Sequence, residues 1–343
     1  MTQNNTTTVR KTALWVGILA LIALFLYTLL DVGTTGITPQ DRISTFTTRF
    51  LGIFIEAAPF LLMGSLVSGL IEVYISKDDL VRILPKNPIL ATIGGAFMGL
   101  AFPVCECGVV PVARRLFTKG LPMSVGITFL LAAPVMNPIV FVSTFIAFGW
   151  TEIIVLRFVV TAIVAIAVGL IFATVARPHE TLLPVSFAPV RGGNNGTFAP
   201  VPQQKGLLTS LYRACRVASD EFFEMGRFLI IGSLLAAWMQ TRVSQQDLLN
   251  IGSGMLVSVL VMQALAFVLS LCSTVDAFLA LSFLNTFSTG ALVAFLTFGP
   301  MVDIKSAMMF SGVFKKKIVA YLVILPFLMT LLIGLWINIW IMR

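Results

Sequence analysis

Charge is scarce in this chain: of its 343 residues, 11% are charged and 58% are hydrophobic. Ordinary soluble domains contain about 25% charged residues. A chain with so little charge cannot cover the surface of a soluble domain, which excludes a soluble enzyme or binding module. Many of its apolar runs reach the roughly 20 residues that a helix needs to cross a bilayer core. The sequence therefore predicts an all-α polytopic membrane protein with about 8 to 9 transmembrane helices.

Other absences narrow the function. Histidine occurs once, cysteine four times, and the sequence has neither a Walker-type phosphate loop nor a G-x-G-x-x-G motif. Direct use of ATP by this chain is therefore unsupported, and we expect neither a cofactor nor an enzymatic activity. Cys105, Cys107 and Cys272 lie in apolar runs, so free thiols are expected rather than a disulfide framework. The net charge of +8 comes from short basic clusters between apolar runs, which set membrane orientation and do not indicate nucleic-acid binding.

The apolar runs divide the chain into an N-terminal helix and two halves. The first run, 12–30, follows two basic residues and predicts a retained membrane helix with a cytoplasmic N-terminus. Further runs occupy 46–75, 88–117, 121–148, 152–176, 218–240, 251–285, 289–313 and 317–342. A stretch rich in proline and glycine predicts a cytoplasmic linker. The expected parts are a tail and first helix at 1–45, a first repeat at 46–176, the linker at 177–216 and a second repeat at 217–343.

The two halves resemble each other at three places in the same order. The matching stretches are "EAAPFLLMGSL" from Glu56 with "EMGRFLIIGSL" from Glu224, "LAFPVCECG" from Leu100 with "LAFVLSLCS" from Leu265, and "FLLAAPVMNP" from Phe129 with "FLTFGPMVDI" from Phe295. The offsets are 168, 165 and 166 residues, so Cys107 corresponds to Cys272 and Asn137 to Asp303. This predicts an internal two-fold repeat, the usual plan of secondary transporters, with the substrate site near the midplane.

The orientation of the repeat depends on whether the run 88–117 crosses the membrane. If it crosses, Arg114, Arg115 and Lys119 lie outside, against the positive-inside tendency. If it turns back within the membrane, all the basic clusters are cytoplasmic and the halves are inverted. Arg157 then lies near the outer face, where its long side chain can reach water. We favour the re-entrant arrangement, and nine simple crossings with parallel repeats remain the alternative.

The stretch "GLAFPVCECGVVPVARR" (99–115) places Cys105, Glu106 and Cys107 inside an apolar run. A proline two residues before the pair and a glycine directly after it interrupt the helix, and irregular backbone at membrane depth is tolerated only where it is buried or lines a cavity. Thiolates suit soft partners such as Cu(I), Zn(II) or trivalent arsenic. On a helix the two side chains would point about 200° apart, so one soft centre can bind both only where the backbone is not helical. Cys272 is the candidate for a third sulfur.

The linked elements "FPVCECGVVPVARRLFTKGLP" and "ITFLLAAPVMNPIV" resemble the signature of the ArsP-type family of predicted permeases, and the resemblance extends from about residue 45 to the C-terminus. The resemblance implies a membrane permease. Some members of that family export trivalent organoarsenicals such as methylarsenite with the help of membrane cysteines, so the resemblance also implies a thiol-seeking substrate. By the matching motif, substrate-binding roles carry over to Cys105 and Cys107 only.

Charged residues inside the apolar runs cost about 2.5–3.5 kcal/mol each on insertion scales and usually serve a function. Glu56 and Glu106 are candidates for proton coupling or gating, and so are Asp276, Asp303 and Lys305. Asp303 and Lys305 would diverge on a regular helix, so each is expected to find another partner, for example Lys305 with Asp276.

Two further polar residues in the apolar runs are candidates for substrate binding or transport. Asn137 lies between two prolines and is a candidate substrate-binding residue, because its amide can donate and accept hydrogen bonds. Glu224 corresponds to Glu56 but has Arg227 three residues on, which indicates either an ion pair on the helix surface or a transport role.

The sequence thus predicts a secondary-active efflux permease of the cell membrane that moves a small thiol-reactive compound, such as a trivalent organoarsenical. Its expected partners are this substrate and the lipid bilayer, and a homo-oligomer is left open. Two alternatives stay open as well. The C-x-C pair could serve a membrane thiol oxidoreductase by cycling between dithiol and disulfide. The permease could instead carry Cu(I) or Zn(II), although a single histidine argues against zinc.

Overall fold

The computed structural model describes residues 39–76, 79–80, 82, 85, 87–101, 104–175, 182–183, 207–242, 254–284 and 286–341. The predicted membrane helix at 12–30, the proline before the cysteine pair and most of the predicted linker lie outside these ranges. The chain forms two units, Met1–Leu51 and Gly52–Arg343. Every side-chain contact described below belongs to the second unit.

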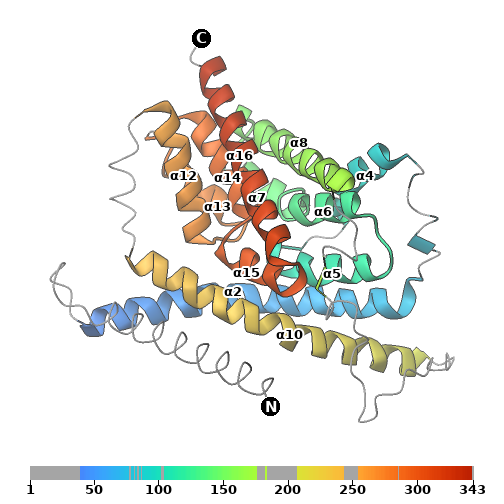
Figure 1. The fold of residues 1–343 in the computed structure, drawn as a ribbon. Helices are drawn as coiled ribbons and strands as arrows, with labels where there is room; N and C mark the ends of the chain where they lie inside the picture. The colour runs from blue at the N-terminus through green and yellow to red at the C-terminus, as the bar shows by residue number, and fades with distance from the viewer. Residues whose placement is uncertain are drawn as a thin grey trace, which may run out of the picture. The chain divides into compact units, whose positions relative to one another are not determined.

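The regular elements of the described residues are helices (Figure 1). They are α2 (Pro39–Tyr74), α4 (Pro88–Ala101), α5 (Glu106–Thr118), α6 (Met123–Ala132), α7 (Pro138–Phe148), α8 (Glu152–Val175), α10 (Leu207–Arg242), α12 (Met255–Leu269), α13 (Asp276–Leu281), α14 (Thr289–Met301), α15 (Ile304–Val313) and α16 (Lys316–Ile341). Because α10 begins at Leu207, it extends into the stretch predicted as linker. Another part of that stretch is anchored, since the Leu183 amide donates to the Val313 carbonyl oxygen (2.9 Å).

Several helical stretches can cross a membrane. Five of those described are long and apolar enough, namely Ile43–Tyr74, Glu152–Thr174, Leu208–Arg242, Thr289–Val313 and Lys316–Trp340. Shorter apolar helices occupy Pro88–Leu100, Met123–Ala132, Pro138–Phe148 and Met255–Leu269. The prediction of an all-helical polytopic membrane protein is confirmed.

Four of the predicted apolar runs are each broken into two helices. The breaks lie between α4 and α5, α6 and α7, α12 and α13, and α14 and α15. The sequence predicts the interruption between α4 and α5 from the proline and glycine around the cysteine pair. Asn137 and Asp303 are the N-caps of α7 and α15, and each side chain accepts a hydrogen bond from a backbone amide of its helix. These two corresponding residues therefore occupy the same structural position in the two halves.

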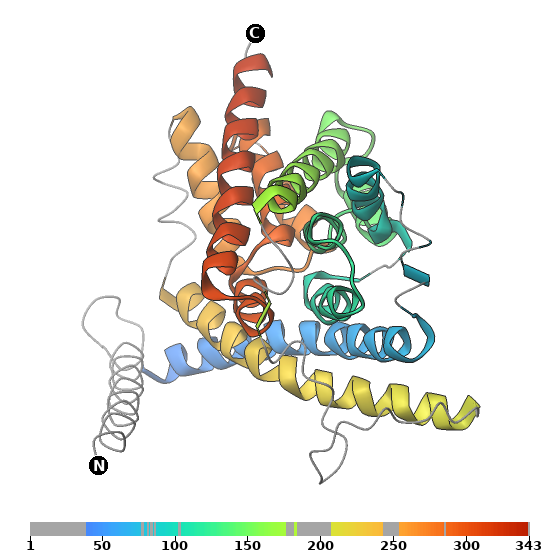
Figure 2. The same cartoon turned by 45° about the vertical axis from the view of Figure 1, so that its right-hand side comes forward.

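The order of helices in the second half of the chain follows the order in the first. α2 and α10 both have 36 residues. In each half a long helix is followed by two broken pairs and a final long helix (Figures 1 and 2). α6 packs against α4 and α8, and α14 packs in the same way against α12 and α16. The order of the helices and the packing of α6 and α14 therefore match between the two halves.

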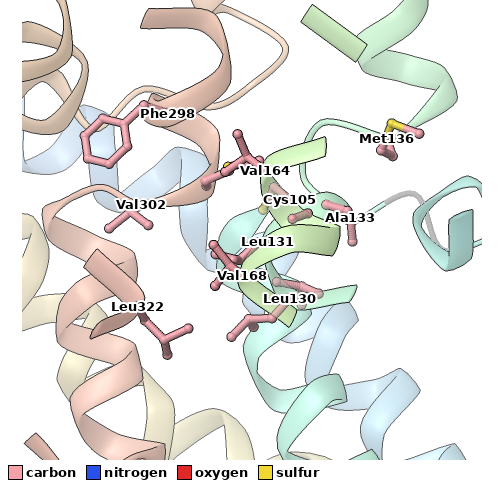
Figure 3. Packing of buried hydrophobic residues seen from close by; sticks show 14 of the residues in the cluster. Cys105, Leu130, Leu131, Ala133, Met136, Val164, Val168, Phe298, Val302 and Leu322 are labelled. Carbon is pink, nitrogen blue, oxygen red and sulfur yellow. The ribbon is translucent and has the colours of Figure 1, made fainter. Parts of the chain in front are cut away.

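The core of the second unit lies around α6, α8 and α14. Every residue of α14 from Gly290 to Met301 is buried. Leu130 and Leu131 of α6 and Val168 of α8 belong to one cluster of buried apolar side chains, which also includes Cys105 (Figure 3). The broken ends of the helices therefore lie inside protein, where irregular backbone is tolerated at membrane depth.

Two glycines that correspond in the repeat bring long helices against the broken ones. A Cβ atom at Gly64 of α2 would lie 2.3 Å from the Gly108 carbonyl oxygen, and one at Gly232 of α10 would lie 2.9 Å from the Lys305 Cα. Only a residue without a side chain permits these approaches. α2 and α10 therefore hold the first turns of α5 and α15, which carry the residues described next.

Candidate functional site

Three buried thiols from both halves of the chain come together. Cys105, Cys107 and Cys272 are 6%, 1% and 3% exposed. The Cys105 thiol has both other thiols as neighbours. Cys105 is the N-cap of α5 with extended backbone (φ −79°, ψ 177°), so it is not on the helix with Cys107, and the two side chains do not take opposite helix faces. Cys272 lies in the irregular stretch between α12 and α13.

We name these three residues the thiol cluster. The sequence predicted Cys105 and Cys107 as ligands and Cys272 as a third sulfur, and the structure places all three together. Among the described residues, no three His, Cys, Asp or Glu side chains form a group that could hold a metal ion. The fourth cysteine, Cys215, is exposed.

A buried ion cluster joins the first turns of α5 and α15. The Lys305 ammonium lies 3.2 Å from Oε1 of Glu106 and 3.5 Å from Oδ2 of Asp303. The three residues are 1–2% exposed. Within the described part of the chain, Oε2 of Glu106 and Oδ2 of Asp303 have no hydrogen-bond partner. Two carboxylates beside one ammonium leave an excess of negative charge in a buried place, which is costly unless a cation or proton balances it.

The predicted divergence of Asp303 and Lys305, and the suggested pair of Lys305 with Asp276, are wrong. Asp303 precedes α15 and has extended backbone (φ −130°, ψ −178°), so its side chain does not follow the helical spacing. It forms a capping box with Ser306, in which Oδ1 accepts from the Ser306 amide. This leaves Oδ2 directed at the Lys305 ammonium.

A second buried ion pair joins α8 to α13. Arg157 is 0% exposed, and its Nη2 lies 2.7 Å from Oδ2 and 3.0 Å from Oδ1 of Asp276. Its Nη1 donates to the Thr144 hydroxyl (2.9 Å). The Arg157 side chain does not reach water as predicted, because residues of α7, α8 and α13 enclose it. The presence of an arginine inside an apolar run could have indicated this ion pair, because such a charge usually pairs with a residue of opposite charge.

A third ionic group connects α5 with α2 and α10. Arg114 forms a two-point contact with Glu224 (2.7 and 3.2 Å). Arg115 lies 3.5 Å from Glu72 and 3.4 Å from Glu221, and Lys119 lies 3.2 Å from Glu72. The Ser68 hydroxyl donates to the same Glu221. These contacts tie the first half to the second at the C-terminal part of α5.

The partner of Glu224 differs from the one suggested by its neighbour along the helix. Glu224 pairs with Arg114, whereas the guanidinium of Arg227 lies over the Phe228 ring, 4.9 Å from its centroid. The sequence analysis missed Glu72 and Glu221 entirely. The two residues lie on different helices, α2 and α10, and only the fold brings Arg115 to both.

Two other predicted site residues, Glu56 and Asn137, belong neither to the thiol cluster nor to the ion clusters. Glu56 is half-buried on α2, one turn before Phe60, whose carbonyl oxygen lies against Gly108. Asn137 is 5% exposed, and its Oδ1 accepts a hydrogen bond from the Ile139 amide (2.9 Å). The Asn137 side chain is thus engaged in capping α7.

Comparisons with known proteins give one consistent result. The model of the ArsP_1 family, described as "Predicted permease", matches residues 42–339. The chain is 44% identical over 288 residues to the UPF0718 protein YcgR of Bacillus subtilis, an alignment covering 83% of this chain and 94% of that protein. It is 42% identical over 275 residues to a Streptococcus mutans protein named "Putative two-component membrane permease complex subunit", covering 79% and 87%. No solved structure matches the chain significantly.

Proposed function

Because the chain belongs to the ArsP_1 family of predicted permeases, we propose that it is a secondary-active permease that exports a small thiol-reactive compound. Trivalent organoarsenicals are the proposed substrate class, and Cys105 and Cys107 are the proposed ligands. The observation that carries this proposal is the thiol cluster: buried sulfurs at two helix breaks, beside a buried ion cluster. Charged residues inside a membrane protein are costly and usually serve a function.

The chemistry of reversible binding fits these side chains. Methylarsenite, CH₃As(OH)₂, exchanges its two hydroxyl groups for two thiols and releases two water molecules. Arsenic stays trivalent, two As–O bonds are replaced by two As–S bonds, and no oxidant is needed. The reverse reaction with water, or exchange onto another thiol, releases the substrate. A pair such as Cys105 and Cys107 binds both positions of the same arsenic atom, which gives affinity without irreversible capture.

We propose Glu106 as the carboxylate that carries the coupling proton. It stands between the two ligand cysteines, one of its oxygens is without a hydrogen bond in the described part of the chain, and its ion cluster has an excess negative charge. Asp303 is less suited because its other oxygen is held by the helix cap. Asp276 is paired with Arg157, and Glu56 is half-buried on α2.

The repeat supplies the proposed transport movement. In this proposal the halves are inverted, the chain crosses the cell membrane with its N-terminus in the cytoplasm, and the thiol cluster lies near the midplane. Rocking of one half against the other would expose the cluster to each side in turn. The matching order of helices in the two halves supports this scheme.

A second protein subunit is a further proposed partner. The Streptococcus mutans relative is named as a subunit of a two-component membrane permease complex. By analogy, a second membrane component would act together with this chain. A homo-oligomer is the alternative assembly.

A growth screen tests the proposed function. A sensitive bacterial strain expressing the chain is exposed to arsenite, methylarsenite, antimonite, copper and zinc. We expect protection against trivalent organoarsenicals of at least several-fold in inhibitory concentration, lost in Cys105→Ser/Cys107→Ser and kept in the exposed-cysteine control Cys215→Ser. Protection against copper or zinc alone would show that the substrate is a soft metal ion and not an arsenical. A redox-dependent change in thiol labelling without any protection would favour the thiol oxidoreductase.

A further inference from the structure

The stretch that carries Cys272 is held from two directions. It follows α12 and passes through Ser270, whose φ of 49° lies in the left-handed region that residues other than glycine rarely adopt. On its N-terminal side the contacts come from the second half of the chain. The side-chain amide of Gln240 donates to the Leu269 carbonyl oxygen (2.7 Å), and the backbone amide of Ile304 donates to the Ser270 hydroxyl (3.3 Å).

On the C-terminal side, the stretch is anchored by the first half of the chain. Arg157 donates through Nη2 to the Ser273 carbonyl oxygen (3.2 Å) and to both carboxylate oxygens of Asp276. Ser273 directly follows Cys272, and the Asp276 amide donates to the Cys272 carbonyl oxygen (3.1 Å). The Arg157 guanidinium therefore binds the backbone and a side chain directly after Cys272.

The planar fork of arginine suits this task better than a lysine would. One guanidinium meets a hydroxyl on α7, a backbone carbonyl and a carboxylate at once, whereas an ammonium is a compact point charge without a fixed fork. Because Arg157 is fully buried and belongs to α8, it relates the position of Cys272 to the first half, where Cys105 lies.

We infer that Arg157 is a positioning residue of the thiol cluster, which holds Cys272 within reach of Cys105 so that one ligand can bridge the two halves. The ligand class is a trivalent arsenical with two exchangeable groups. This inference rests on the proposed function in taking the thiols as substrate ligands. Binding exchanges two As–OH groups for two As–S bonds with release of two water molecules, as for methylarsenite.

The test uses two parent proteins that each keep one pair of thiols, both with Cys215→Ser. Cys107→Ser leaves the pair that bridges the halves, Cys105 with Cys272. Cys272→Ser leaves the pair within the first half, Cys105 with Cys107. Phenylarsine oxide, which reacts with two neighbouring thiols, is the probe, and its binding to the purified full-length chain is measured by intact mass against a competing dithiol.

Each parent then receives Arg157→Gln together with Asp276→Asn, so that no buried charge loses its partner. We expect probe affinity to fall by on the order of tenfold or more in the bridging parent, because the two thiols lose their fixed proximity. Affinity in the Cys272→Ser parent should be unchanged, and this also shows that the variant folds. Arg157→Lys should recover part of the lost affinity, because it keeps the charge but not the fork.

The outcomes separate this inference from the proposed function. Equal loss of affinity in both parents would overturn the inference, since Arg157 would then only support the fold. Unchanged affinity in both would overturn it as well, because Cys272 would be held without Arg157. If the Cys272→Ser parent did not bind the probe, the proposed ligand pair Cys105 and Cys107 would be wrong, and the bridging parent would still decide the role of Arg157.

Discussion

Replacement of Lys305 by methionine is expected to lower the free energy of unfolding by about 3–5 kcal/mol, the usual cost of removing one partner from a buried ion pair. The reason lies in the ion cluster. Glu106 and Asp303 are 2% and 1% exposed and share the Lys305 ammonium. Without it, two carboxylates remain buried with no cation. Thermal or denaturant unfolding of the purified protein in detergent measures the effect.

Two control variants make this prediction specific. Lys316→Met removes an exposed ammonium at the start of α16 and should change stability by little. Adding Glu106→Gln to Lys305→Met removes one of the two uncompensated carboxylates, so much of the lost stability should return while transport stays low. Wild-type stability of the single Lys305→Met variant would contradict the ion cluster as described.

Replacement of Asp276 by leucine is expected to have a similarly large effect, about 3–5 kcal/mol of lost stability. It leaves the guanidinium of Arg157 charged and 0% exposed. Adding Arg157→Met should restore stability to near the wild-type value, because a buried ion pair can often be replaced by apolar side chains of similar size. The exposed Asp220→Asn on α10 is the matched surface control, and unfolding in detergent is again the measurement.

A failure of the double variant to recover would show that the Arg157 contacts with Thr144 and Ser273 matter more for folding than the charge balance does. Recovery of stability together with loss of bridging between Cys105 and Cys272 would separate the two roles of Arg157: charge compensation for the fold, and positioning for the thiol cluster.

Features that depend on short stretches of sequence were predictable. Three of the four helix breaks have a proline or glycine close to them, and the break between α12 and α13 falls in a stretch of polar residues. The caps at Asn137 and Asp303 lie where these residue types favour a helix start. The predicted repeat makes Cys107 and Cys272 corresponding residues, and the structure places both beside Cys105. The family resemblance was confirmed by the match over residues 42–339.

Partners of the buried charges were not predictable in the same way. Lys305 and Glu106 are 199 residues apart in the chain, and Arg157 and Asp276 are 119 apart. A charged residue inside an apolar run is expected to have a partner of opposite charge. The sequence contains several charged residues that could be that partner. The partner of Lys305 depends on the packing of α5 against α15. The partner of Arg157 depends on the packing of α7 against α8 and α13. The extended backbone at Asp303 likewise decided its contact with Lys305, and the sequence did not reveal it.

The central claim is that Cys105 and Cys107 carry the substrate, and uptake of methylarsenite into everted membrane vesicles tests it most directly. With a proton gradient present, vesicles containing the wild-type chain should accumulate the arsenical, and Cys215→Ser should behave alike. Cys105→Ser/Cys107→Ser should reduce uptake to the level of vesicles without the protein. Uptake by this double variant equal to that of the wild type would contradict the account.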